Sequence, residues 1–183
     1  NAISKNKTKI KSAGIMNNNL LQELNISDGL LKLHDSKQNK ELGFTRSERS
    51  ENNLLGLLPD VVMSLQEQVD RSYLQYKRFK NAFEKNIYLR CLHDANERLF
   101  YALVSQNLTE MLPIIYTPTV GDVVQEYSLE FRKARGLYIA YPDKHKIVEI
   151  LEKNKRDLDV IVVSDSQGIL GIGDQGVGGI EIP

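Results

Sequence analysis

Apolar residues recur at intervals of three and four through most of the chain before residue 130, which is the spacing of one face of an α-helix. A helix is predicted from Asp60 onward, and its apolar face consists of Val62, Leu65, Val69, Tyr73 and Tyr76. A second helix is predicted over 83–107, with apolar positions Ile87, Leu92, Leu99, Phe100, Leu103 and Val104. The first part of the chain is therefore predicted to be helical, with the two tyrosines as packing residues.

Shorter helices flank these two. The leucine-rich segment 20–33 is interrupted by Ser27-Asp-Gly29 and predicts two short helical pieces joined by a turn. Thr45-Arg-Ser-Glu48 fits a capping box and predicts that a helix begins there. Residues 143–155 predict another helix, with apolar positions Ile147, Val148, Ile150 and Leu151.

The pattern changes after residue 133. Gly136–Tyr141 is typical of a short strand, and Asp159–Ser164 is almost entirely apolar and β-branched, as a buried parallel strand is. With the helix between them, these strands predict a βαβ unit. The predicted fold class is therefore α then α/β. A helical domain spans 20–133, and 134–183 begins a Rossmann-like, parallel-sheet domain with a glycine-rich loop. Residues 1–19 are polar and predict a disordered or tag-derived arm.

Composition narrows the possible partners. The 24 Lys and Arg balance the 24 Asp and Glu, so the net charge of zero gives no electrostatic basis for binding nucleic acid or an anionic membrane. No apolar run approaches the ~20 residues of a membrane span. The single cysteine, Cys91, excludes an intramolecular disulfide and suits a reducing compartment. We expect a cytoplasmic protein, with an organelle as the alternative.

A glycine-rich segment near residue 170 raises the question of a nucleotide site. Gly171-Ile-Gly173-Asp-Gln-Gly176 fits the G-x-G-x-x-G pattern of dinucleotide-binding loops. That site also needs a following helix and an acidic residue roughly 20 positions later, and neither follows in this sequence. Residues 165–168 predict a tight turn, so the loop is approached as in a hairpin. We expect the chain to be an incomplete piece without a nucleotide site of its own.

The most informative stretch is Met111–Asp122. Thr117 is predicted to cap a helix whose first residue is Pro118, and the helix is predicted to continue over 120–133. Tyr116 then lies just before a helix N-terminus, where partial positive charge favours anions. A tyrosine phenol is protonated at neutral pH and can donate a proton. The alternative is an ordinary half-buried tyrosine.

Ile114-Ile-Tyr-Thr-Pro-Thr-Val-Gly121 resembles the signature of the malic enzyme family. Five further segments resemble this family in the same order: Asn39–Thr45, Leu54–Pro59, Asn96–Tyr101, Arg135–Ile139 and Ile169–Asp174. The resemblance covers roughly residues 39–183. It implies that the complete enzyme oxidatively decarboxylates L-malate to pyruvate and CO2, with NAD or NADP and with Mg or Mn.

The resemblance also implies roles for individual residues. In the family, the tyrosine that matches Tyr116 protonates the enolpyruvate carbon. The glycine-rich loop resembles a wall of the substrate pocket, and Leu170 and Gly171 are the loop residues expected nearest malate. The family's catalytic lysine, metal carboxylates and main nucleotide fingerprint would come after residue 183. An isolated fragment of this kind is expected to be inactive and to hold neither cofactor nor metal.

Two positions depart from the family pattern. Many malic enzymes carry an arginine before the Ile-Leu-Gly of the loop, and here that position is Gly168. Malolactic enzymes, which convert malate to lactate and CO2, resemble this glycine variant. The arginine used for fumarate activation in some animal relatives is matched by Ala95, so fumarate activation is not expected.

Several weaker features remain. His93 and Glu97 have metal-binding spacing on a helix, but a solvated or subunit-contacting helix face is the simpler interpretation. Cys91 is predicted to pack as a small apolar residue. The family resemblance implies a homodimer or higher homo-oligomer with contacts in the helical part. A non-catalytic chain that acts only as a dimerisation partner is a third functional hypothesis, beside malic and malolactic activity.

Overall fold

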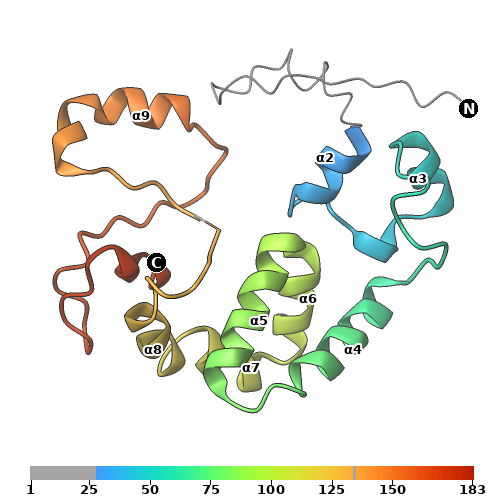
Figure 1. The fold of residues 1–183 in the computed structure, drawn as a ribbon, viewed down its shortest axis with the longest axis horizontal. Coiled ribbons are helices and arrows are strands. Elements are labelled where there is room, and N and C mark those ends of the chain that lie inside the picture. Colours follow the sequence, from blue (N-terminus) through green and yellow to red (C-terminus); the bar gives the residue numbers. More distant parts are fainter. Residues whose placement is uncertain (1–27, 134) are drawn as a thin grey trace, which may run out of the picture.

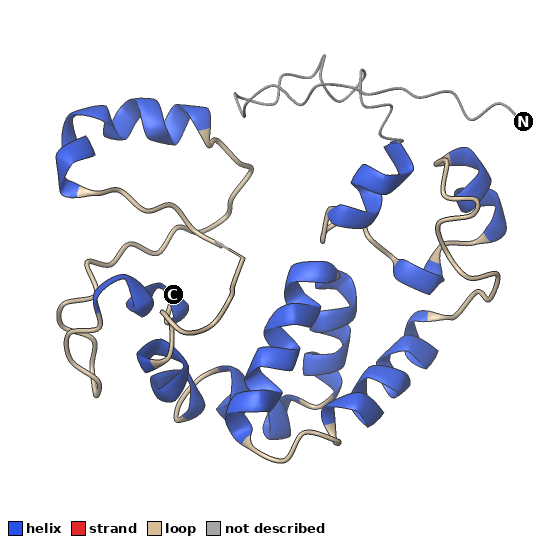
Figure 2. Cartoon of the chain, viewed as in Figure 1, coloured by secondary structure: helices blue, strands red, loops and turns tan. Residues whose placement is uncertain are grey.

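The computed structural model describes residues 28–133 and 135–183, and its helices follow one another in an open arc (Figure 1). The α-helices are α2 (Asp28–His34), α3 (Arg46–Glu51), α4 (Leu65–Tyr76), α5 (Ala82–Ala95), α6 (Glu97–Gln106), α7 (Leu108–Ile115), α8 (Thr119–Gln125) and α9 (Ile147–Lys153). Three 3-10 turns are η1 (Glu41–Gly43), η2 (Tyr141–Lys146) and η3 (Gly176–Glu181). Figure 2 shows that loops join these elements, and no β-strand lies in the described ranges.

The hydrophobic core lies among α4, α5, α6 and α7. Its buried members are Val69, Tyr76, Leu89, Leu99, Phe100, Leu103, Val104 and Met111. Tyr73 packs against this cluster, and its ring stacks on that of Tyr76 at a centroid distance of 6.2 Å. The sequence prediction that these two tyrosines are packing residues is confirmed.

Capping side chains fix where the long helices begin. The helix predicted from Asp60 begins only at Leu65, because the Ser64 hydroxyl accepts a hydrogen bond from the backbone N–H of Glu67. The helix predicted over 83–107 is two helices, α5 and α6. Asn96 separates them with extended backbone (φ −153°, ψ 90°), and its Oδ1 accepts from the N–H of Leu99 at 3.0 Å. The apolar spacing continues across this break, so periodicity alone does not reveal it.

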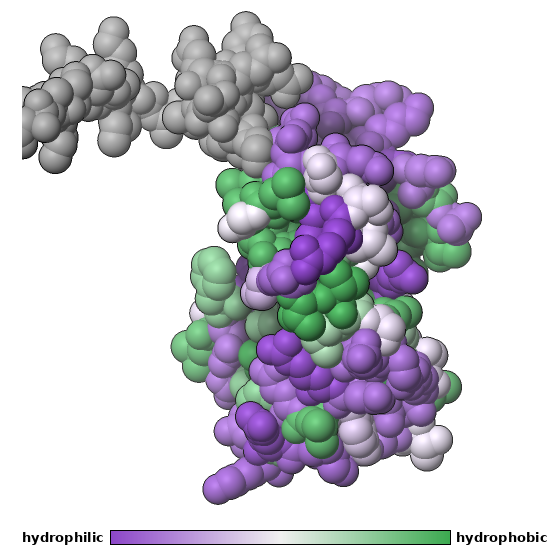
Figure 3. Space-filling model, turned by 90° about the vertical axis from the view of Figure 1, so that its right-hand side faces the viewer, coloured by the Kyte–Doolittle hydropathy of each residue, from purple (hydrophilic) through white to green (hydrophobic). Residues whose placement is uncertain are grey.

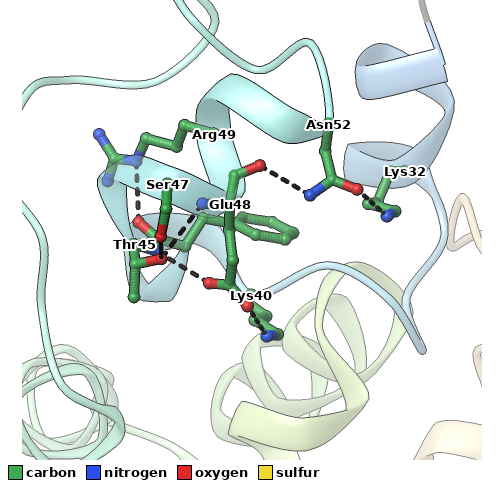
Figure 4. A network of polar contacts seen from close by, with 8 residues as sticks. Lys32, Lys40, Thr45, Ser47, Glu48, Arg49 and Asn52 are labelled. Atoms are coloured by element: carbon green, nitrogen blue, oxygen red, sulfur yellow. Dashed lines mark hydrogen bonds and ion pairs between the residues drawn. The ribbon is translucent and has the colours of Figure 1, made fainter.

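The predicted capping box at Thr45 is confirmed, and α3 follows it (Figure 4). The Thr45 hydroxyl accepts from the N–H of Glu48, and Glu48 accepts from the N–H of Thr45. The Lys40 ammonium lies 2.5 Å from the same carboxylate and, with the Thr45 bonds, holds the pKa of Glu48 below its usual value. This network fixes the entry of α3 beside η1.

Helix α8 is shorter than predicted. It ends at Gln125 rather than continuing to Lys133, and the N–H groups of the next residues close turns onto Asp122 and Val124. Val120, Val123 and Val124 are buried. The backbone of η3 lies close against this helix, because a Cβ on Gly178 would come within 2.8 Å of the Val124 carbonyl oxygen.

Both predicted strands are wrong for the described residues. Residues 136–141 and 159–164 form no ladder, and one isolated antiparallel bridge, between Ile169 and Gly173, is the sole β-type pairing there. A strand requires a hydrogen-bonded neighbour, and none of the described segments supplies one. Val160 and Val163 are consequently 76% and 87% exposed. The helix predicted over 143–155 forms as η2 followed by α9.

The helical prediction for 20–33 is confirmed only for α2, because residues 20–27 and the arm 1–19 lie outside the described residues. The face that carries α2, α3 and α4 is largely hydrophilic with separate hydrophobic patches (Figure 3). Leu55 and Val61, which lie between α3 and α4 in the chain, are exposed apolar residues. In the described part of the chain, every helix is too short or too polar to cross a membrane.

Candidate functional site

Tyr116 ends α7 and leads directly into the turn before α8. Its backbone N–H donates to the Leu112 carbonyl at 2.9 Å, and its own carbonyl accepts from the N–H of Val120 at 2.9 Å. These two bonds fix the tyrosine between the helices. Its side chain is 49% exposed, and its hydroxyl makes no hydrogen bond to any described residue. The phenol is therefore fixed at its base and free to meet a ligand.

Thr117 does not cap α8 as predicted. The helix begins at Thr119, its N-cap is Pro118, and no side chain caps it. Thr119 instead turns back, and its hydroxyl donates to the Pro113 carbonyl at 2.7 Å. This bond satisfies a carbonyl near the C-terminal end of α7. The seven-residue helix α8 begins three positions after Tyr116, and not at Pro118 as predicted.

The glycine-rich loop turns back tightly on itself. The N–H of Ile169 donates to the Gly173 carbonyl at 3.1 Å, and the N–H of Gly173 donates to the Ile169 carbonyl at 2.8 Å. Leu170, at the tip, is fully exposed. Gly171 and Gly173 have φ values of +84° and +75°, a region that side chains disfavour, and an added Cβ at either would meet no atom within 4 Å. The loop thus presents open backbone.

The loop and the tyrosine meet the same helix. A Cβ on Gly121, in the first turn of α8, would lie 3.7 Å from Cγ2 of Ile172, so the loop lies against the end of α8 that follows Tyr116. Gln175 helps to fix the loop, because its backbone N–H donates to the Ser166 carbonyl at 3.0 Å. Leu170 and Gly171 therefore belong to a loop that contacts the first turn of α8. Gly168 precedes it with open space around its Cα.

A second polar cluster joins α5 and α6 to the segment before Gly136. Arg135 donates to Asp94 at 2.7 Å and to Glu97 at 3.3 Å, and its guanidinium lies 2.9 Å from Nε2 of His93. The His93 ring stacks on Phe100 at 4.2 Å. Burial, followed by the nearby Arg135, lowers the pKa of His93 to about 4. His93 is thus a packed, neutral side chain. The interpretation of a solvated helix face is wrong for it, and the alternative of a subunit contact stays a prediction.

A third cluster was not foreseen from the sequence. Glu181, in η3, has a buried side chain (5% exposed) that lies 2.8 Å from Nη2 of Arg90 in α5 and 3.7 Å from Nη1 of Arg132. Tyr127 and Tyr138 share a hydrogen bond of 2.7 Å nearby. Burial, the bond to Tyr127 and the Glu181 charge raise the pKa of Tyr138 to about 12. Glu181 and Arg90 stand 91 positions apart, so no local pattern signals their pairing.

Among the described residues, neither a three-ligand metal site nor a complete nucleotide fingerprint is formed. They contain no group of three His, Cys, Asp or Glu side chains that could hold a metal ion, so they do not fit Mg or Mn. The G-x-G-x-x-G loop follows no strand and leads into a six-residue 3-10 turn, whereas the nucleotide fingerprint needs a strand before it and an α-helix after it. Cys91 is exposed, so its predicted packing role is wrong.

The sequence of this chain is similar to those of known proteins. Residues 93–183 match the family described as malic enzyme, N-terminal domain. The chain is 52% identical over 146 residues to the NAD-dependent malic enzymes of Aeromonas hydrophila and Proteus mirabilis, and 51% identical to that of Acinetobacter baylyi. Each alignment covers 79% of this chain and 26% of the relative, so the chain spans about a quarter of the length of these proteins. Through its N-terminal domain, the chain belongs to the malic enzyme family.

Proposed function

We propose that this chain is the substrate-side, N-terminal part of an enzyme that oxidatively decarboxylates L-malate to pyruvate and CO2, with NAD or NADP as hydride acceptor and with Mg or Mn. The relatives that are 51–52% identical bear the name NAD-dependent malic enzyme, which favours NAD. The whole protein is proposed to act as a homodimer or larger homo-oligomer. The chain alone is proposed to be inactive.

The observation that carries this proposal is the position of Tyr116. Its exposed hydroxyl has no partner among the described residues, and it stands where α7 meets α8, the helix whose first turn the glycine-rich loop contacts. A phenol held by its backbone and open at its hydroxyl suits a general acid, because the proton is available and the atom that carries it is positioned.

In the proposed reaction, Tyr116 acts after CO2 has left. Loss of CO2 leaves enolpyruvate as its enolate. The Tyr116 hydroxyl donates a proton to the enolate carbon from which CO2 departed, which forms the methyl group of pyruvate and leaves a phenolate to be reprotonated. Leu170 and Gly171 are proposed to approach malate from the loop, where the open backbone at Gly171 permits close contact. The base that removes the malate hydroxyl proton is not proposed among the described residues.

Gly168 favours a second candidate, malolactic decarboxylation to lactate and CO2. An arginine at this position would supply a forked cation for a carboxylate, and glycine supplies none. Malate would then be held by other groups. A non-catalytic dimerisation chain is the third possibility.

The test uses the native-length protein with L-malate, Mn and either NAD or NADP. Reduced nucleotide is followed by absorbance, and the acid formed is identified by chromatography. Pyruvate formed together with an equal amount of reduced nucleotide is the expected result. Lactate without accumulated reduced nucleotide supports the malolactic reaction instead. If a protein that has been shown to fold forms neither pyruvate nor lactate, both catalytic proposals are contradicted.

A further inference from the structure

Glu181 is a buried carboxylate that connects segments distant in the sequence. Its side chain is 5% exposed, and that of Arg132 is 6% exposed. Arg90 belongs to α5, Arg132 to the connection after α8, and Glu181 to η3, which follows the glycine-rich loop. We name these three residues the Glu181 clamp. It joins the helical core to the loop that carries Leu170 and Gly171.

The Glu181 clamp is poorly suited to serve stability alone. Nε of Arg90 and both Nε and Nη1 of Arg132 are buried without a hydrogen bond. A buried ion pair gains little net stability when its polar atoms are incompletely satisfied, because both charges have left water. Removal of one partner is nevertheless costly, because the other charge stays buried and uncompensated. Such a pair therefore favours one arrangement of its segments over others.

The glycine-rich loop is held together mainly by bonds within itself, such as those between Ile169 and Gly173. Positive φ values at Gly171, Gly173 and Gly176, with open space at each, leave its backbone little fixed by side-chain packing. Its contacts to the helical part are apolar or backbone contacts, namely Ile172 near Gly121 and η3 against α8. In the described part of the chain, Glu181 makes the loop segment's ion pair with α5.

We propose that Glu181 is a positioning residue, which through Arg90 and Arg132 holds the glycine-rich loop in register with Tyr116. This inference rests on the proposed function, because the loop is taken to contact the substrate. Loss of the Glu181 clamp releases the loop while Tyr116 stays fixed by its own backbone bonds in α7 and α8. Loss of the clamp should therefore weaken malate binding more than it slows proton donation by Tyr116.

The test compares Glu181→Gln and Arg90→Met with a matched control, Glu126→Gln, in the native-length protein. Glu126 follows α8 directly and is exposed. Hydrogen–deuterium exchange measures the loop without any assay of activity. Either clamp variant should speed amide exchange in 168–180 by roughly tenfold and leave exchange in α4 and α6 unchanged. The control should exchange as the unchanged protein does.

The kinetic measurement tests positioning against a purely structural role. Either clamp variant should raise the KM for malate about tenfold and change kcat by less than about threefold. The double variant Arg90→Met with Glu181→Gln should be no worse than the worse single variant, because both changes break one interaction. Arg90→Lys retains the positive charge, so amide exchange in 168–180 should be almost as slow as in the unchanged protein. This variant replaces Arg90→Met if Arg90→Met does not fold.

Unchanged exchange in 168–180 for Glu181→Gln would overturn the proposal, as would strictly additive effects of the two changes. A roughly tenfold fall of kcat with unchanged KM for malate would also overturn the proposal, because that outcome places the defect in the chemical step. If the native-length protein proves inactive on malate, the exchange measurement still decides whether Glu181 holds the loop. Failure of the proposed function and failure of this inference are therefore distinguishable.

Discussion

Tyr116 shows how one residue can be both fixed and available. Its backbone closes α7 through Leu112 and opens α8 through Val120, while its hydroxyl is free of partners among the described residues. The sequence predicted Tyr116 as the proton donor from its motif, although the predicted cap at Thr117 was wrong. The role of the phenol stays a prediction, and it depends on the hydroxyl alone.

Tyr116→Phe removes that hydroxyl and retains the ring. In the native-length protein, we expect kcat to fall by about 10²–10⁴-fold, the usual contribution of a general acid, while the KM for malate changes little. Steady-state kinetics with varied malate measures both values. Turnover near that of the unchanged protein would remove Tyr116 from the proton-donor role.

We expect His93 to make the free energy of unfolding depend on pH. Its pKa of about 4 lies below the ordinary value of 6.5, because burial and Arg135 disfavour the imidazolium more than Glu97 and Asp94 favour it. Between these two values the unfolded chain binds more protons than the folded chain, so the free energy of unfolding falls as the pH drops. Above pH 6.5 the contribution of neutral His93 is fully present.

His93→Gln should weaken this dependence. Urea unfolding at about pH 7 and about pH 5 gives the loss of stability for each protein, and the loss should be smaller in the variant because glutamine does not titrate. The carboxylates that titrate near pH 4 are common to both proteins and cancel in the comparison. Equal losses would show that His93 titrates alike in the folded and unfolded chain.

At the scale of elements, η3 depends on a close approach at Gly179. A Cβ there would collide with the Ser166 side chain and would come within 2.8 Å of Cδ1 of Ile169. We expect Gly179→Ala to displace η3 from the loop and to lower the free energy of unfolding by about 1–3 kcal/mol, as overpacking does.

Gly168→Ala is the matched control, because Gly168 has an ordinary φ and nothing lies within 4 Å of an added Cβ. Urea unfolding of both variants makes the comparison, and Gly168→Ala should change stability by less than about 0.5 kcal/mol. If Gly168→Ala lowers the free energy of unfolding as much as Gly179→Ala does, the collision of the added Cβ with Ser166 and Ile169 is not the cause of the loss.

The elements that the sequence predicted best are those with local signals. Thr45 and Glu48 form their capping box because both partners lie within four residues. The break at Asn96 was missed, because apolar spacing runs through it and only the cap reveals it. The predicted strands failed because a strand depends on a partner far away in sequence. The Glu181 clamp was missed for the same reason, since Arg90 is distant along the chain.

At the scale of the whole molecule, burial is unevenly distributed. Helices α4 to α7 enclose a core, whereas α9 and the segment 158–163 expose apolar side chains such as Val148 and Val163. The proposed site lies between these regions, at the α7–α8 junction and the glycine-rich loop that contacts α8. The central claim is that L-malate binds at this junction.

The most direct measurement is hydrogen–deuterium exchange of the native-length protein with and without L-malate, in the presence of Mn and NAD. Bound malate should slow amide exchange in 112–118 and 168–176, because these segments carry Tyr116, Leu170 and Gly171. Exchange in α2 and α3 should stay unchanged, which provides the internal reference. Slower exchange elsewhere, with both junction segments unaffected, would contradict the account.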